Sequence, residues 1–218
     1  MSAREAILAR IRKAHGRPGS EPTAAELEAV RGHIARHAAG PQPSLARPAD
    51  PAAQFRRECD RVGTTHAHAA SLAEVPHEVA RYLEANTLER RVVGWREFAH
   101  LDWAGAGITF DDRAAEPADR TGLTGCFCAI AETGTLLLLS SPDHPRKTAL
   151  LPETHVAVVS AARLVATMED AFALLRRERG EPPRATWFVS GASRTADIEQ
   201  TLVIGAHGPY RAHVVLVP

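Results

Sequence analysis

The sequence predicts an α/β protein: a three-layer domain with a mostly parallel sheet flanked by helices, preceded by an N-terminal helical arm. Two observations lead to this prediction. From about residue 50 to the C-terminus, short apolar runs alternate with capped helical patterns, as strands alternate with helices in parallel sheets. Several of the runs are apolar on both faces, which is typical of strands buried between helices.

The composition argues against several classes of protein. The chain has 26 Lys and Arg against 26 Asp and Glu and an isoelectric point of about 7.2, so no excess positive charge favours binding to nucleic acid or an acidic membrane. No apolar run approaches the roughly 18 residues that a membrane span requires. The N-terminus lacks the apolar core of a secretory signal. We therefore expect a cytoplasmic protein without a membrane span.

The first 48 residues predict a helical arm and a linker, and residues 49–218 predict the α/β domain. Two capping boxes, Ser2 with Glu5 and Thr23 with Glu26, each precede a narrow apolar stripe at helical spacing. A Pro-rich stretch follows the second helix. Because the stripes are narrow and the linker is long, we expect the arm to pack on the surface of the domain or on a partner chain.

The domain itself is predicted to contain several strands and capped helices. The predicted strands are residues 64–70, 91–95, 108–110, 136–140, 155–160, 185–190 and 213–217. Helices are predicted after residue 51, after Ser71 and after Thr167. A further helix is predicted to begin near Thr195 and to turn Ile198 and Leu202 inward.

One candidate site surrounds a glycine turn before an apolar strand. Gly134 permits a tight backbone path, and the amides and hydroxyls of Thr133 and Thr135 are suited to holding an anion. Glu132 is a candidate acceptor, base or nucleophile. The same residues also fit a turn whose side chains only satisfy backbone groups.

A second candidate site follows the strand that ends near residue 189. A glycine turn that leads into a helix presents free amides and the positive end of the helix dipole to an anion. The candidate ligand-binding residues here are Gly191, Ser193, Arg194, Thr195 and Asp197. Arg194 supplies a fork for a carboxylate or phosphate. A capped helix with a surface salt bridge explains the pattern equally well.

Two further side chains complete the candidate set, and no cofactor is expected. His207 lies in a turn between glycines and is a candidate for proton transfer, although a structural histidine is more common there. Arg146 is placed to close over an anion or to remain solvated. The pairs His66/His68 and Cys126/Cys128 lack a further close pair, so we expect no metal site. Three cysteines are too few for an iron–sulfur cluster, and both the Walker loop and the dinucleotide fingerprint are absent.

Four segments together resemble the LUD-domain family, and within it the lactate-utilisation C proteins. They are residues 125–135, 151–155, 190–199 and 205–209, in this order and spacing. The resemblance implies a fold similar to the sugar-phosphate isomerase and coenzyme A transferase superfamily. It also implies a part in the oxidation of L-lactate to pyruvate beside two iron–sulfur partner proteins. Ala192 departs from the proline usual in the family, and the resemblance supplies no catalytic residue.

Three functions remain open at this level. The first is a non-redox subunit of a lactate-oxidising system that binds a small anionic ligand and acts with iron–sulfur partner proteins. The second is an independent enzyme acting on a small phosphorylated or coenzyme A-linked substrate, suggested by Glu132 opposite an anion site. The third is an interaction module without chemistry of its own.

Overall fold

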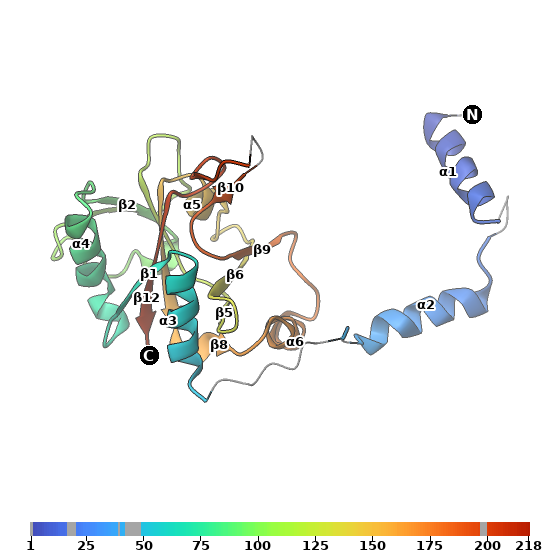
Figure 1. The fold of residues 1–218 in the computed structure, drawn as a ribbon, viewed down its shortest axis with the longest axis horizontal. Helices are drawn as coiled ribbons and strands as arrows, with labels where there is room; N and C mark the ends of the chain where they lie inside the picture. The colour runs from blue at the N-terminus through green and yellow to red at the C-terminus, as the bar shows by residue number, and fades with distance from the viewer. Residues whose placement is uncertain (1, 17–20, 39, 42–48, 197–199) are drawn as a thin grey trace. The chain divides into compact units, whose positions relative to one another are not determined.

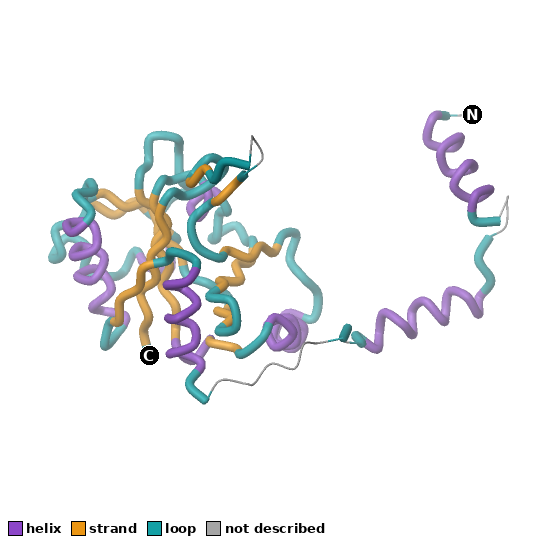
Figure 2. The backbone as a smooth tube through the Cα atoms, viewed as in Figure 1, coloured by secondary structure: helices purple, strands orange, loops and turns teal. Residues whose placement is uncertain are grey.

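The computed structural model describes residues 2–16, 21–38, 40–41, 49–196 and 200–218. The chain divides into two compact units, residues 1–45 and 46–218. Figure 1 labels their helices and strands, and Figure 2 colours them by type. None of the described helices is long and apolar enough to cross a membrane.

The first unit contains the two predicted helices, α1 (Ala3–Ala14) and α2 (Ala24–Arg36). Both begin at the expected capping boxes, in which the Ser2 and Thr23 side chains accept hydrogen bonds from the third helical residue. Neither helix buries a residue, and their apolar side chains Ile7, Ile11, Leu27, Val30 and Ile34 are exposed.

The second unit is built on a six-stranded sheet in which all strands are parallel. Its order is β1 (Thr65–His68), β12 (Arg211–Val217), β7 (Thr154–Ser160), β4 (Thr121–Thr124), β2 (Arg91–Gly94) and β3 (Thr109–Asp111). The predicted α/β class with a mostly parallel sheet flanked by helices is thus confirmed. Residues 121–124 were not predicted as a strand, because two threonines and a glycine in four residues give no apolar run.

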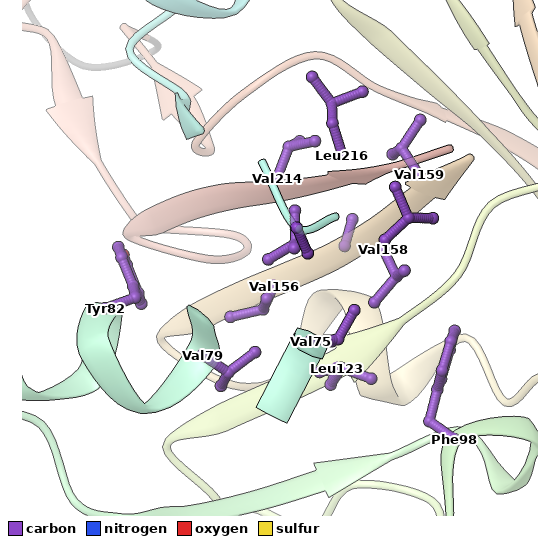
Figure 3. Close-up of a cluster of buried hydrophobic side chains, with 14 of the residues drawn as sticks. Val75, Val79, Tyr82, Phe98, Leu123, Val156, Val158, Val159, Val214 and Leu216 are labelled. Carbon is purple, nitrogen blue, oxygen red and sulfur yellow. The ribbon is translucent and has the colours of Figure 1, made fainter. Parts of the chain in front are cut away.

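Helices α3 (Pro51–Arg61), α4 (Val75–Ala85) and α5 (Lys147–Leu150) accompany this sheet, with short 3-10 helices at Leu72–Glu74, Arg96–Phe98 and Ala161–Arg163. In Figure 3, Val75 and Val79 of α4 lie beside Val156 of the sheet. All three side chains are fully buried. The apolar stripe of α4 therefore forms part of the main core, as its helical spacing predicts.

A second sheet of four strands contradicts part of the prediction. It has the order β8 (Leu164–Val165), β5 (Cys128–Ile130), β6 (Thr135–Leu139) and β9 (Thr186–Val189), and α6 (Met168–Arg179) packs on it. Residues 136–140 and 185–190 were predicted to join the parallel sheet. Instead, β6 pairs antiparallel with both β5 and β9. The turn of residues 131–134 is too short for a parallel crossover, so it imposes a hairpin.

The predicted helix near Thr195 is also wrong. Arg194–Thr195 forms the short strand β10, which pairs antiparallel with β11 (Val203–Ile204). Leu202 is exposed and lies outside any helix. Asp197, Ile198 and Glu199 lie outside the described residues.

Candidate functional site

The two predicted glycine loops meet at the C-terminal end of α3. Gly134 has a φ of 64°, and a Cβ atom there would lie 2.8 Å from the backbone nitrogen of Cys59. Gly191 has a φ of 80°, and a Cβ atom there would lie 2.6 Å from the carbonyl oxygen of Val62. Both loops therefore approach the same backbone at distances that only glycine permits. We call residues 131–135, 190–195 and 205–209 the motif junction.

A chain of hydroxyl groups joins two of these loops. The Oγ1 atoms of Thr133 and Thr135 are 2.7 Å apart, and the Oγ1 atom of Thr135 is 2.6 Å from the Oγ atom of Ser190. Thr135 is buried, whereas Thr133 is half-buried. These linked hydroxyl groups thus connect the interior of the motif junction with its outer side.

Arg194 is held at the junction by the end of α3. Its guanidinium donates a hydrogen bond of 2.8 Å to the carbonyl oxygen of Val62, while the residue as a whole is exposed. An arginine is well suited to the unsatisfied carbonyl groups at a helix end. The bond uses one of five N–H donors and fixes the direction of the side chain.

The loop that carries His207 is tied to the same strand. The Ser193 amide donates to the carbonyl oxygen of Pro209 at 2.9 Å, and the Gly205 amide donates to the carbonyl oxygen of Ser193 at 2.9 Å. The structure therefore brings His207, Ser193 and Arg194 into one region. His207 is exposed and Ser193 is half-buried.

The space beneath the motif junction is closed. A cavity of only about 10 Å³ lies between Gly134 and Gly191, lined also by Thr64 and His155. One water molecule is the most that such a volume holds. This small cavity therefore has no room for a small organic anion.

Other predicted residues are not joined to Arg194. Among the described residues, no hydrogen bond or ion pair connects the Glu132 side chain with the Arg194 guanidinium. Arg146 precedes α5 and follows Pro145, whose carbonyl oxygen accepts a hydrogen bond from the Trp95 indole at 3.4 Å. This contact places the Arg146 segment beside the carboxyl end of β2. Thr195 lies in strand β10 and does not cap a helix.

Sequence reasoning missed a larger cavity at the carboxyl ends of β2 and β4. Its volume is about 260 Å³, and it is lined by Trp95, Glu97, Cys126, Phe127, Leu139, His144, Arg163, Glu178 and Arg179. The signal that could have found it is the charged pair Arg96 and Glu97 directly after the predicted strand 91–95, but residues 121–124 were not recognised as the neighbouring strand.

The described residues contain no group of three or more His, Cys, Asp or Glu side chains arranged to hold a metal ion. Cys59, Cys126 and Cys128 are free cysteines. Burial raises the pKa of the Cys59 thiol to about 12 and that of the Cys128 thiol to about 11. These thiols are therefore neutral near pH 7, a form that is a poor metal ligand.

Comparison with known protein families shows to which family this chain belongs. The model of the LUD domain matches residues 52–217, which includes every described strand of both sheets. The chain belongs to the LUD domain family. The arm lies outside the match, and the LUD domain accounts for the whole of the α/β unit from α3 onward.

This LUD-domain protein is similar in sequence to several bacterial proteins. An uncharacterised protein of Neisseria meningitidis is 28% identical over 96% of this chain and 91% of the relative. A lactate utilization protein C of Deinococcus radiodurans is 33% identical over 75% of this chain and 78% of the relative. The lactate utilization protein C of Bacillus subtilis is 37% identical, but the match spans only 48% of this chain and 45% of that protein.

The fold is similar to that of a solved LUD-type structure. A DUF162 family protein from Deinococcus radiodurans has a TM-score of 0.55 and 28% sequence identity. The similarity covers 80% of this chain and 99% of the other. The α/β architecture described above is thus found in a crystal structure of a relative.

Proposed function

We propose that this LUD-domain protein is a component of L-lactate utilisation that acts with iron–sulfur partner proteins and itself binds a small anion. The names of the Deinococcus and Bacillus relatives support the pathway. The chain has three cysteines, whereas an iron–sulfur cluster generally needs about four, so the electrons of lactate oxidation would pass through the partners. A cytoplasmic location stays a prediction.

The observation that carries the anion site is the fixed, exposed guanidinium of Arg194. Its hydrogen bond to the Val62 carbonyl oxygen orients the guanidinium group and leaves other N–H donors for a ligand. A planar fork suits a carboxylate or a phosphate. Ser193, Thr195 and Thr133 are proposed to complete the ligand contacts, together with the backbone of Gly134 and Gly191. Arg146 and Asp197 remain candidates without a described contact to this site.

Two side chains near this site are proposed for proton transfer. Glu132 lies in the turn before β6, where its amide donates a hydrogen bond of 3.1 Å to the carbonyl oxygen of Ala166. That bond fixes the backbone from which the carboxylate projects. His207 is the second candidate, on the loop tied to Ser193. Each is a residue type that exchanges protons readily in catalysis.

Titration calorimetry with L-lactate, pyruvate, acetate and phosphate tests the anion site. We expect Arg194→Ala to weaken binding by about 1–3 kcal/mol, the usual scale of a hydrogen bond to a charged group. Arg184→Ala, which removes an exposed arginine outside the motif junction, is the matched control. Equal affinity of the wild type and Arg194→Ala for every anion would overturn the assignment.

Co-purification tests the partnership. A tagged full-length chain, co-expressed with the iron–sulfur lactate-utilisation proteins of the same cell, is expected to retain them on the column. The iron is expected to leave with the partners when the complex is dissociated. Stoichiometric iron on the isolated chain, or no association with these proteins, would contradict the proposal.

A further inference from the structure

Two buried polar side chains line the small cavity beneath the motif junction. Within the described part of the chain, neither the Oγ1 atom of Thr64 nor the Nε2 atom of His213 has a hydrogen-bond partner. The two residues keep only 4% and 5% of their surface exposed. Such unpaired buried groups are rare, because they give up their hydrogen bonds to bulk water. Two of them around one cavity point to a common partner inside it.

The backbone of Thr64 holds its hydroxyl group in this region. Thr64 lies between α3 and β1, and its amide donates a hydrogen bond of 2.8 Å to the carbonyl oxygen of Cys59. The side chain is branched at Cβ, so rotation about χ1 offers it few other positions. The hydroxyl group therefore has little freedom to find a partner elsewhere.

The imidazole of His213 is fixed from its other side. Its Nδ1 atom lies 2.8 Å from the Oγ1 atom of Thr65, the residue that faces His213 in the pairing of β1 with β12. The ring is also stacked on Tyr82, with 4.0 Å between centroids and 17° between the planes. A rotation that gave Nε2 another partner would break both contacts.

The charge of His213 narrows the choice of partner. Burial lowers the pKa of the imidazole to about 4, and the nearby His66 acts in the same direction, so the ring is neutral near pH 7. In a neutral imidazole one nitrogen donates a hydrogen bond and the other accepts one. A water molecule both donates and accepts, so it can pair with Nε2 in either tautomer and with the Thr64 hydroxyl.

The volume of the cavity matches a single water molecule. About 10 Å³ is close to the smallest space in which a protein holds one, and an internal water molecule needs two to four polar partners. Thr64 and His213 supply two. A larger neutral ligand has no room.

An ion is not expected in this space. An ion would lose its hydration shell here without meeting an opposite charge, which is strongly unfavourable. The lining contains no carboxylate, lysine or arginine, and burial also keeps the imidazole of His155 neutral near pH 7. The residues that line the cavity are Thr64, Gly134, Leu136, His155, Val189, Gly191, Ala212, His213 and Val214.

We propose that this cavity holds one internal water molecule, which hydrogen-bonds to Oγ1 of Thr64 and to Nε2 of His213. The water molecule ties the segment before β1 to β12. It lies beneath Gly134 and Gly191, the glycines of two motif-junction loops, whereas the remaining lining belongs to buried strands or to the link between α3 and β1. The water molecule therefore exchanges with solvent when one of these loops moves. The proposal does not depend on whether Arg194 binds an anion.

Magnetic relaxation dispersion of ¹⁷O water counts the long-lived water molecules of the full-length protein. We expect the double variant Thr64→Val/His213→Phe, which removes both polar partners, to hold one such molecule fewer than the wild type. Thr148→Val is the matched control, because its hydroxyl is also buried without a partner but lies outside this cavity lining. An unchanged count in the double variant, or an equal loss in Thr148→Val, would overturn the proposal.

A high-resolution crystal structure of the wild-type protein tests the site without any substitution. We expect electron density for one water molecule within hydrogen-bond distance of both Oγ1 of Thr64 and Nε2 of His213. Absence of this density would overturn the proposal even if the double variant failed to fold.

A loop variant tests the exchange path. Gly191→Ala places a Cβ atom 2.6 Å from the carbonyl oxygen of Val62, so it should displace the loop and shorten the residence time of the water molecule. Gly180→Ala also introduces a side chain at a positive φ, but far from any neighbour, and should leave the residence time unchanged. Equal residence times in the two variants would overturn exchange through this loop.

Discussion

The Nε2 atom of His155 lies 2.8 Å from the Oγ1 atom of Thr124 inside the parallel sheet. Both residues are almost fully buried, with 1% and 0% of their surface exposed. Burial lowers the pKa of His155 to about 4, so the imidazole is neutral near pH 7. His155 also lines the small cavity beneath the motif junction, so this bond fixes one wall under the candidate site.

Thr124→Val is expected to destabilise the protein by about 1–3 kcal/mol. The substitution preserves the shape of the side chain but leaves a buried imidazole nitrogen without its partner. Thr121→Val is the matched control on the same strand, because the Thr121 hydroxyl is buried without a hydrogen-bond partner. Urea unfolding should show the loss only in Thr124→Val. An equal loss in both variants would mean that the hydrogen bond contributes nothing.

The protein should lose stability as the pH falls from about 6.5 to about 4. Burial lowers the pKa values of His155 and His213 to about 4, below the usual value of about 6.5. In this range the unfolded chain binds protons that the folded chain does not, so each histidine removes up to about 3 kcal/mol of stability. Above about pH 6.5 these histidines are unprotonated in both the folded and the unfolded chain, so their titration no longer lowers the free energy of unfolding.

His213→Phe tests the second of these histidines. The imidazole is stacked on Tyr82 with 4.0 Å between ring centroids, and its Nε2 atom is buried without a partner. A phenyl ring keeps the stacking and cannot take up a proton. We expect a shallower dependence of the unfolding free energy on pH, measured by urea denaturation between pH 4 and 7. An unchanged slope of unfolding free energy against pH would show that His213 does not contribute to the pH dependence.

Gly134→Ala is expected to cost more than about 2 kcal/mol. The substitution adds a Cβ atom at a positive φ and within 2.8 Å of the Cys59 amide. Gly180→Ala separates the two effects, because Gly180 also has a positive φ of 70° but nothing within 4 Å of its Cβ position. Only the cost of a non-glycine residue at a positive φ is expected there, without a steric clash. Similar thermal shifts for both variants would show that the loop does not pack closely on α3.

Deletion of residues 1–45 is expected to leave the α/β unit folded. The two arm helices bury no residue, and the LUD domain match begins at residue 52. Calorimetry should still show one cooperative transition for the remaining unit. Loss of cooperative unfolding in the shortened chain would show that the arm contributes to the core.

Local features of the sequence determined the helices and several strands. The side chains of Ser2, Thr23 and Thr167 each cap a helix that begins at the next residue, because a capping box requires only residues three positions apart. The apolar runs at 155–160 and 213–217 likewise became buried central strands, β7 and β12. The glycine-containing motifs were sufficient to indicate the family.

Tertiary structure alone decided sheet membership and the composition of the cavities. An apolar run such as Leu136–Leu139 has the same pattern in a parallel and in an antiparallel sheet. The antiparallel arrangement of β6 was decided by the four-residue turn before it and by its pairing with β9, about 50 residues away. Arg194 met the end of α3 rather than a helix start because β10 pairs with β11. Glu97, His144 and Arg179 share one cavity because the fold brings together the segment after β2, the segment before α5 and the end of α6. Such long-range pairing leaves no signature in local periodicity.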